Sequence, residues 1–406
     1  MKILFLVSSF PALSETFILN QITGLIDEGY DVEIVSTKKV TPPYHPDVER
    51  YQLMDKVTYI DVPANKIKKL RLVAKESARI GVRKTADLLN KKVYGTFVYS
   101  FRPLLFQSYI TKNVMNWEAI ICHYGSNALL VEIIKVANPE IDFPPILSFF
   151  HGNDITGFTK RFGEEIYAPL HQANQHFLPI SENWKKRLLE LGFPKDKIDV
   201  HHMGVDRTKF AKVELSDFTQ PIRLLIVGRL TEKKGIDDAI LAVKQLKESG
   251  HAIQLNIIGD GELHTMLKQL INELDIVDHV KLMGWQDQDT VKAFMEQADI
   301  ILLPSKQAEN GDMEGIPVSL MEALATGKLV VSTYHSGIPE LIKDDYNGWL
   351  IPENSPEQLA EKIADILKMS YKERLEISKN AVKSIHDHFD IHQLNKQLSQ
   401  KIKQVK

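Results

Sequence analysis

Two glutamates, Glu314 and Glu322, stand eight positions apart in the segment DMEGIPVSLMEALATG, and their spacing favours a chemical role. Carboxylates accept hydrogen bonds from paired hydroxyls, so one can bind a sugar and the other a ribose diol. The segment also predicts a helix that begins at Pro317, and the N-terminal N–H groups and dipole of such a helix suit a diphosphate. A structural alternative is that Glu314 complements the dipole and Glu322 is an ordinary exposed helix residue.

Basic side chains follow the predicted strand RLLIVG in the segment GRLTEKKG. Arg229 comes directly after this strand and Lys234 five residues later, beside glycines, which favours binding of diphosphate charge. A solvated turn is the alternative for Lys233 and Lys234. In IIGDGEL, by contrast, the two glycines are better explained by a tight turn than by a dinucleotide-binding fingerprint.

Two histidines end predicted strands in the first half of the chain. His151 opens HGND, with Asp154 three residues later, and His123 lies in CHYGSN. A histidine at a strand end can hydrogen-bond a sugar hydroxyl or carry a proton. Either can instead be a core histidine, and we favour the functional role only for His151. In the first loop, Ser14 is expected as a helix N-cap and Glu15 as a first-turn acid.

Metal-ligand spacing is not evident in this sequence. Asp287 and Asp289 form a D-x-D pair, but a helical pattern follows them, which favours an N-cap over a metal ligand. The single cysteine, Cys122, excludes a cysteine-rich zinc site and an intrachain disulfide framework. We therefore expect no metal and no cofactor.

Strand and helix patterns alternate along two stretches of the chain, which predicts parallel sheets with helices on both faces. The fold class expected is α/β, with two Rossmann-like doubly wound domains. The expected boundaries are 1–205 for the N-terminal domain, 206–221 for a linker and 222–387 for the C-terminal domain, with a helix over 388–406 packing back on the first. The predicted strands are KILFLVSS (2–9), DVEIVST (31–37), AIICH (119–123), ILSFFH (146–151), HFLPIS (176–181), RLLIVG (223–228), QLNIIG (254–259), VKLMG (280–284), DIILLPS (299–305) and LVVST (329–333).

Composition excludes several classes of protein. The 406 residues are 44% hydrophobic and 25% charged, as in ordinary globular proteins of two domains. A net charge of −3 gives no field that selects nucleic acid. Met1 runs directly into a predicted strand, and no apolar run is long enough to span a bilayer, so we expect a cytoplasmic protein.

One segment, 65–92, is strongly basic. It contains ten lysines and arginines against only Glu76 and Asp87. Ile67, Leu70 and Val82, with two alanines between them, can share a helical face, which is typical of helices that rest on anionic lipid. A solvated helix that covers a sheet would show the same pattern.

The motifs together resemble those of the retaining GT-B glycosyltransferases of family 4. The resemblance covers the whole C-terminal half, and the E-x7-E spacing of the two glutamates is specific. Segments in the N-terminal half are most similar to the colanic acid and amylovoran glycosyltransferases of bacterial exopolysaccharide assembly. The segments are GRLTEKKG, PSKQAENGDMEGIPVSLMEALATG, STYHSGIPELI, NGWLIPEN, FPALSETFILNQI, HGND and HMGVDRTKF.

This resemblance implies that a hexose moves from a nucleotide-sugar donor, UDP-galactose or another UDP-sugar, to a lipid-linked or oligosaccharide acceptor. It assigns Arg229 and Lys234 to the donor diphosphate, in place of a metal. It assigns Glu322 to the ribose and Glu314 to the transferred sugar, with His151 near the reacting carbon. Retention is usually explained by front-face attack in which a donor phosphate oxygen takes the acceptor proton, so no side-chain nucleophile is expected.

The resemblance also implies roles for backbone and base contacts. Gly315, Ile316 and Val318 would bind diphosphate and sugar hydroxyls through the backbone, and the base would lie near Gly284 and Trp285. The acceptor would be a polyprenyl-diphosphate-linked saccharide, which favours peripheral attachment of segment 65–92 to the inner membrane face.

The first loop departs from the family pattern, because SSFPALSE replaces the glycine pair of many members. Ser14, Glu15, His123 and Asp154 therefore become candidates for first-loop or acceptor contacts. Two other functions remain as alternatives. One is another GT-B enzyme, such as a nucleotide-sugar epimerase or a sugar phosphorylase, and the other is a non-catalytic nucleotide-sugar-binding subunit of a polysaccharide assembly complex.

Overall fold

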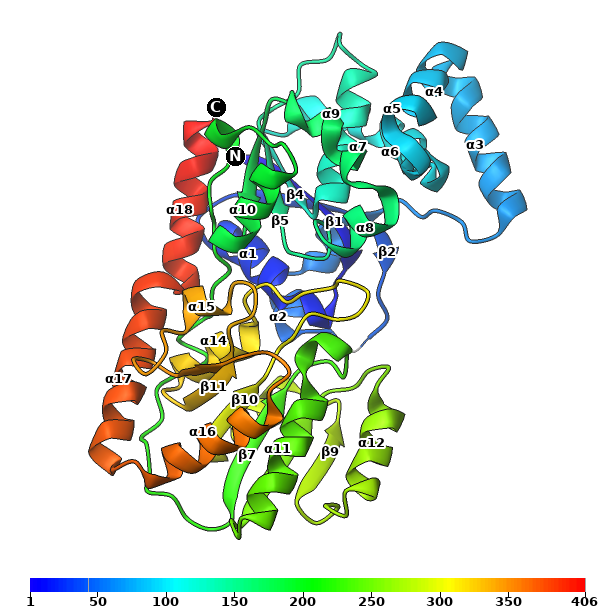
Figure 1. Cartoon of the computed structure of the whole chain (residues 1–406). Helices are drawn as coiled ribbons and strands as arrows, with labels where there is room; N and C mark the ends of the chain where they lie inside the picture. The colour runs from blue at the N-terminus through cyan, green and yellow to red at the C-terminus, as the bar shows by residue number, and fades with distance from the viewer. Residues whose placement is uncertain (43, 406) are drawn as a thin grey trace. The chain divides into compact units, whose positions relative to one another are not determined.

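The computed structural model describes residues 1–42 and 44–405, apart from the side chain of Ser14. The chain forms two compact units, which we describe one at a time. Unit 1 comprises Met1–His202 and His392–Lys406, and unit 2 comprises Met203–Ile391. Figure 1 shows a sheet with helices in each of them.

The sheet of unit 1 is parallel throughout and has the strand order β3-β2-β1-β4-β5-β6. The central strand β1 is fully buried from Ile3 to Val7. These residues are apolar because both faces of the sheet are covered. Strand order reverses between β1 and β4, and such a switch point opens a crevice at the carboxyl ends of the strands. The strands are β1 (Lys2–Phe10), β2 (Asp31–Lys39), β3 (Val57–Tyr59), β4 (Ala119–His123), β5 (Ile146–Phe150) and β6 (Gln175–Pro179).

Helices α3 to α6 form a group at one side of the unit 1 sheet (Figure 1). The basic helix α3 packs against α6, where Ser108 Oγ donates to Glu76 Oε2 over 2.8 Å, and it does not cover the sheet. The helices of unit 1 are α1 (Thr16–Asp27), α2 (Pro46–Arg50), α3 (Lys66–Ile80), α4 (Val82–Leu88), α5 (Lys91–Tyr94), α6 (Arg102–Asn113), α7 (Gly125–Val136), α8 (Gly157–Phe162), α9 (Ala168–His171), α10 (Glu182–Glu190) and α18 (Ile391–Gln404).

The C-terminal helix α18 belongs to unit 1 although unit 2 precedes it in the chain. Its buried Leu398 and Ile402 form part of the apolar core. Tyr30 OH lies 2.8 Å from Ser399 Oγ, and Asn395 Nδ2 donates to the carbonyl of Asn20 over 3.2 Å. These contacts tie the end of the chain to its beginning.

The sheet of unit 2 is also parallel and has the order β12-β11-β10-β7-β8-β9, which is the topology of unit 1 read from the other edge. Its switch point lies between β7 and β10. The strands are β7 (Ile222–Val227), β8 (Ile253–Ile258), β9 (Val280–Gly284), β10 (Ile300–Leu303), β11 (Leu329–Thr333) and β12 (Trp349–Ile351). The helices are α11 (Ile236–Glu248), α12 (His264–Glu273), α13 (Gln288–Gln297), α14 (Val318–Ala325), α15 (Ile338–Leu341), α16 (Pro356–Lys368) and α17 (Tyr371–His388).

The predicted fold class, α/β with two Rossmann-like doubly wound domains, is confirmed, and all ten predicted strands are present. The expected linker 206–221 lies within unit 2 and packs on α17. There the Arg374 guanidinium stacks over the Phe218 ring at 3.9 Å and donates to Asp217 Oδ1 over 3.0 Å. Across the described residues, none of the helices has the length and apolar character needed to span a bilayer.

Candidate functional site

The start of α14 presents open backbone N–H groups. The helix begins at Val318, one residue later than predicted, because Pro317 keeps an extended backbone with ψ of 126°. No side chain caps α14, and the N–H groups of Gly315 and Ile316 donate to no backbone carbonyl in the described chain. Unpaired N–H groups with the positive end of a helix dipole behind them form a site for an anion.

Glu314 lies in the loop before this helix and is buried between two lysines. Its Oε2 is 2.9 Å from Lys234 Nζ, and its Oε1 is 3.3 Å from Lys233 Nζ. Burial alone would raise the pKa of Glu314, but the two ammonium groups outweigh burial and lower this pKa to about 2. Because it stands four residues before Val318, Glu314 is not the first-turn acid that the structural alternative required.

The structural alternative, in which Lys233 belongs to a solvated turn, is wrong. The Lys233 ammonium also lies 3.0 Å from Asp312 Oδ2, and its side chain is 11% exposed. Lys233 and Lys234 therefore clamp the two oxygens of Glu314 and fix the direction of its carboxylate. Sequence reasoning missed the role of Lys233, because only the fold brings GRLTEKKG against GDMEG.

Glu322 lies on the second turn of α14, half-buried. Among the described residues no group donates a hydrogen bond or forms an ion pair with its carboxylate. Burial raises the pKa of Glu322 to about 8. The structure thus corrects the alternative of an ordinary exposed residue. A protonated carboxyl both donates and accepts, which suits the two hydroxyls of a diol.

Arg229 follows β7 at the switch point of the unit 2 sheet. Its side chain is exposed and forms no ion pair within the described part of the chain. Lys234 returns to the same strand end, since a Cβ on Gly228 would lie 3.4 Å from Lys234 Cε. The structure therefore places Arg229 directly after the strand end that Lys234 contacts.

A histidine and a second glutamate hold the loop that carries Glu314. The fully buried His335 accepts a hydrogen bond at Nε2 from the Glu314 N–H over 3.0 Å. Its Nδ1 lies 2.7 Å from Glu353 Oε1, and Glu353 Oε2 accepts from the Gln307 N–H. Glu353 thus sets the His335 tautomer, and His335 fixes the backbone at Glu314. The segments STYHSGIPELI and NGWLIPEN held these residues, but no spacing rule linked them.

The carboxyl end of β9 carries an exposed aromatic side chain. Gly284 has a φ of +67°, and the Trp285 indole after it is 52% exposed. A flat exposed ring at this edge suits stacking with a base.

The glycines of IIGDGEL are explained by close packing, because a Cβ on Gly259 would lie 1.9 Å from the Gly228 carbonyl oxygen. Asp287 is confirmed as an N-cap and accepts from the Thr290 N–H over 2.8 Å.

In unit 1, β4 and β5 end in two histidines that contact each other. His123 Nδ1 and His151 Nε2 are 3.0 Å apart, with stacked rings. Burial lowers the pKa of His151 to about 3, and burial and the neighbouring His151 lower the pKa of His123 well below its usual value. His123 is completely buried, whereas His151 is partly exposed between Phe17 and Tyr124. The structure therefore makes His123 a neighbour of His151 and does not expose it for an acceptor contact.

Asp154 is buried and its carboxylate accepts three backbone hydrogen bonds. Oδ1 accepts from the N–H groups of His151 and Gly152, and Oδ2 accepts from the Gly125 N–H over 2.9 Å. Burial raises the pKa of Asp154 to about 6, although these hydrogen bonds act to lower it. This carboxylate holds the loops after β4 and β5 together. Its geometry supports a positioning role and not the acceptor contact considered from sequence.

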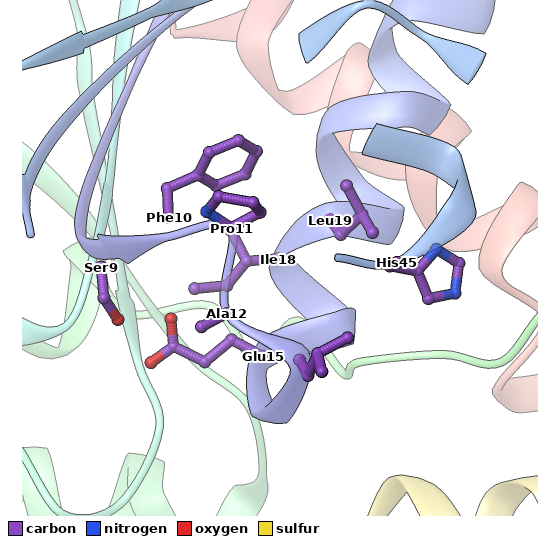
Figure 2. Close-up of a pocket in the computed structure, with 9 residues that line it drawn as sticks. Ser9, Phe10, Pro11, Ala12, Glu15, Ile18, Leu19 and His45 are labelled. Carbon is purple, nitrogen blue, oxygen red and sulfur yellow. The ribbon is translucent and has the colours of Figure 1, made fainter. Parts of the chain in front are cut away.

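The first loop lines a small pocket. Glu15 and Ser9 lie on one side of it and His45 on the other (Figure 2). Tyr124 OH donates to Glu15 Oε1 over 2.7 Å, which links this loop to the end of β4. Helix α1 begins only at Thr16, so Ser14 lies in the preceding 3₁₀ turn and is not its N-cap, and the Ser14 side chain is outside the described residues.

Solved structures with the same fold are glycosyltransferases. The crystal structure of Anabaena Alr3699/HepE in complex with UDP-glucose aligns with a TM-score of 0.74 and 17% identity over 100% of both chains. At this identity the similarity shows the fold alone, which is GT-B. The family model for glycosyl transferases group 1 matches residues 207–384, a range that contains α14, both glutamates and both lysines.

Full-length relatives extend this match to the first unit. The putative colanic acid biosynthesis glycosyltransferase WcaL of Escherichia coli K12 is 37% identical over 406 residues, 98% of each chain. The amylovoran biosynthesis glycosyltransferase AmsK of Erwinia amylovora is 39% identical over 382 residues, 91% of each chain. The chain belongs to the glycosyl transferases group 1 family and is a glycosyltransferase.

Proposed function

We propose that this glycosyltransferase acts with retention and moves a hexose from a UDP-sugar to a lipid-linked or oligosaccharide acceptor in exopolysaccharide assembly. The observation that carries the proposal is the polar end of unit 2. Four features follow strands of one parallel sheet there: the unpaired N–H groups before α14, Glu314 between its two lysines, Glu322 and Arg229. Neither Glu322 nor Arg229 has a side-chain partner among the described residues. Together the four features supply anion binding and two separate carboxyl groups for hydroxyls.

Each group takes one part of the donor. The α14 start, Arg229 and Lys234 bind the diphosphate, and Glu322 binds the ribose diol. Glu314 accepts hydrogen bonds from hydroxyls of the transferred sugar, because the two lysines keep it ionised and aimed. The base stacks near Trp285. These cationic and N–H groups neutralise the phosphates, so we propose a reaction without metal or other cofactor.

The reaction exchanges one bond at the anomeric carbon for another on the same face. The bond from this carbon to the donor phosphate oxygen breaks as the bond to the acceptor oxygen forms, and the acceptor proton passes to a phosphate oxygen of the departing nucleoside diphosphate. Arg229, Lys234 and the helix start stabilise the negative charge on that leaving group. His151 contacts the transferred sugar and needs no proton transfer of its own.

The relatives support the choice of donor and pathway. HepE was crystallised with UDP-glucose, and the two full-length relatives are named for colanic acid and amylovoran synthesis. UDP-galactose is the donor we favour, with UDP-glucose, UDP-N-acetylglucosamine and GDP-mannose as its competitors. A polyprenyl-diphosphate-linked saccharide is the acceptor class we propose.

We also propose that α3 attaches the protein to an anionic membrane surface. Ile67 and Leu70 are 65% and 68% exposed, and Val82 beyond the end of α3 is 87% exposed. Lys66, Lys68 and other cationic residues lie beside this apolar face. An apolar face rimmed by lysines fits the boundary between headgroups and acyl chains.

A thermal-shift screen across nucleotide sugars tests the donor site. We expect the favoured donor to raise the melting temperature of the wild-type protein and to have little effect on Glu322→Ala. Transfer is then tested with labelled donor and extracted lipid-linked saccharides. Stabilisation by no nucleotide sugar would contradict the proposal. Binding without hydrolysis or transfer would instead favour the non-catalytic alternative, and release of an epimerised sugar would favour an epimerase.

A further inference from the structure

Arg102, the first residue of α6, carries a positive charge that no acid neutralises. Its side chain is half-buried and forms no ion pair among the described residues. Burial lowers the pKa of Arg102 to about 10, so the guanidinium remains charged at neutral pH. Removing a cation from water without a counter-ion is unfavourable, which favours a site that an anion completes.

Part of this guanidinium is open to a ligand. Nη2 donates to Asn127 Oδ1 over 2.6 Å, whereas Nε and Nη1 have no hydrogen-bond partner among the described residues. Of these two nitrogens Nε is buried and Nη1 is not. Nη1 therefore reaches the surface with both of its N–H donors, and such donors on a guanidinium suit the oxygens of a phosphate.

Asn127 holds Arg102 where the strand order of unit 1 reverses. Its fully buried side chain donates from Nδ2 to the His123 carbonyl over 2.7 Å and, over 3.4 Å, to Ser8 Oγ. His123 ends β4, and Ser8 lies near the end of β1. Arg102 thus stands at the switch point between these strands, where doubly wound sheets bind ligands.

The start of α7 adds a second positive feature at this point, because Asn127 lies in its first turn. The Ser126 N–H beside it donates to no group in the described chain. Asp154 accepts from the Gly125 N–H over 2.9 Å but forms no ion pair with Arg102. The positive end of the helix dipole and the guanidinium therefore lie together, an arrangement that a bound anion stabilises.

Helix α7 has the same topological place in unit 1 as α14 has in unit 2. Each follows the strand across the switch point, β4 in unit 1 and β10 in unit 2. In unit 2 the strand on the other side of the switch point, β7, is followed by Arg229 and Lys234. The corresponding segment of unit 1, SSFPALSE at the end of β1, contains no lysine or arginine. Arg102 brings a cation to this switch point from α6 instead.

We propose that Arg102 and the start of α7 form an anion site for a phosphate group of the acceptor. This inference rests on the proposed function, in which a diphosphate links the acceptor saccharide to a lipid. A lipid source is favoured because α6 also packs against α3, the helix that we propose rests on the membrane surface. Lys69 Nζ of α3 lies 5.0 Å from the ring centroid of Phe101, the residue before Arg102.

The anion site is tested with the full chain and inorganic pyrophosphate, by hydrogen exchange over residues 124–130. Pyrophosphate should slow exchange there. Arg102→Gln should raise the half-maximal concentration about 10- to 100-fold, as expected for loss of one hydrogen bond to a charged group. Arg102→Lys keeps the charge and should lie between the two. Lys112→Gln removes an exposed cation from the same helix and should match the wild type.

Three results would overturn the anion site. They are no protection of the wild type, equal protection by sodium chloride at the same ionic strength, and equal half-maximal concentrations for the wild type and Arg102→Gln. If Arg102→Gln does not fold, the comparison of pyrophosphate with chloride on the wild type still decides.

A second set of probes separates the lipid from free phosphate and from the donor. Polyprenyl diphosphate in detergent should protect residues 124–130 at lower concentration than pyrophosphate, because its chain adds apolar contacts. UDP should protect the start of α14 equally in the wild type and Arg102→Gln. Protection of residues 124–130 by pyrophosphate alone would overturn the assignment to the acceptor, as would loss of the UDP effect in Arg102→Gln.

The kinetic counterpart measures transfer to a lipid-linked saccharide. Arg102→Gln should raise KM for this acceptor about 10- to 100-fold, with kcat and KM for the donor little changed. A raised KM for the donor with an unchanged KM for the acceptor would contradict the proposal. Absence of turnover in the wild type would count against the proposed function and leave the pyrophosphate result intact.

Discussion

Glu314 and Glu322 carry the same functional group, but their pKa values are shifted in opposite directions. Two lysines outweigh burial at Glu314 and lower its pKa to about 2, whereas burial without a partner raises the pKa of Glu322 to about 8. At neutral pH one is a carboxylate with a fixed direction and the other a protonated acid. On the proposed function, this difference fits the two glutamates to two separate tasks, recognition of the transferred sugar and of the ribose.

Glu322→Gln should reduce the pH dependence of stability. The folded-state pKa of about 8 lies above the unfolded value of 4.5, so the protonated carboxyl contributes stability that is complete below pH 4.5 and lost as pH rises through 8. At pH 8.5 we expect the variant to gain at least about 1 kcal/mol over wild type. Denaturant unfolding from pH 5 to 9 measures this gain. The exposed Glu376→Gln is the control, and equal slopes for both variants would refute the assignment.

Arg229→Ala should lower kcat by about 10²–10³ with little change in KM for the donor, because its contact strengthens as charge develops on the leaving group. Arg229→Lys keeps the positive charge but loses the paired N–H donors of the guanidinium, so its kcat should lie between those of the wild type and Arg229→Ala. Steady-state transfer assays measure both constants. Lys268→Ala on α12 serves as the control, and wild-type turnover in Arg229→Ala would remove this residue from the site.

At the scale of elements, the loop between β10 and α14, which carries Glu314, forms several side-chain contacts with the rest of unit 2. Lys306 Nζ lies 2.7 Å from Asp237 Oδ2 on α11, and the Glu309 N–H donates to Glu232 Oε1. Glu353 and His335 add the tie described above. Such cross-links reduce the entropy that ligand binding would otherwise have to remove from a long loop.

Glu353→Ala should loosen this loop. The change leaves the His335 Nδ1–H and the Gln307 N–H without their acceptor, which we expect to cost about 1–3 kcal/mol. Hydrogen exchange should become faster over residues 305–316 and stay unchanged in unit 1. Glu361→Ala, an exposed residue of α16, is the matched control. Protection equal to wild type in this loop would show that the tie does not hold it.

The membrane proposal also belongs to the scale of elements. Replacing Lys66, Lys68 and Arg71 by Gln should weaken sedimentation with vesicles of anionic lipid by on the order of 100-fold, at about 1 kcal/mol for each charge removed. Lys69 is kept, because its Nζ donates to the Tyr99 carbonyl. The control replaces the exposed Lys268, Lys281 and Lys379 of unit 2. Equal binding of both variants at low salt would exclude α3 as the attachment site.

At the scale of the whole molecule, unit 1 is built from both ends of the chain. Leu394, Leu398 and Ile402 bury one face of α18 in that unit. The first 202 residues therefore lack part of the core of unit 1 without α18.

Leu398→Ala should destabilise unit 1 by about 2–5 kcal/mol, because it opens a cavity in a fully buried position. Two units need not unfold together, so one melting temperature is not sufficient. Hydrogen exchange should show loss of protection in β1 and α1 while β7 and α11 keep theirs. Gln397→Ala, on the exposed face of α18, should change neither. Loss of protection in both units alike would contradict this assignment.

Local pattern was sufficient to locate the strands and the residues that end them. Runs such as KILFLVSS and RLLIVG each contain an unbroken apolar stretch, Ile3–Val7 and Leu224–Val227, as is typical of strands buried on both faces. Their ends, and with them the positions of Arg229 and His151, therefore follow from short windows. The three-residue strands β3 and β12 were not predicted, since so few residues carry no period. The start of α14 differed by one residue, because Pro317 fits both the first helical position and the one before it.

The sequence by itself was sufficient to predict the fold class and to identify the two glutamates as candidate site residues. Both follow from local properties, apolar periodicity and the E-x7-E spacing. Tertiary structure alone decided which groups become partners. Lys234 contacts Glu314 across 80 positions of the chain, and Lys233 contacts it across 81. His335 accepts from the Glu314 N–H across 21 positions. The His123 and His151 rings meet across 28 positions. Parallel strand order creates these contacts, and with them the burial and charge that set each pKa.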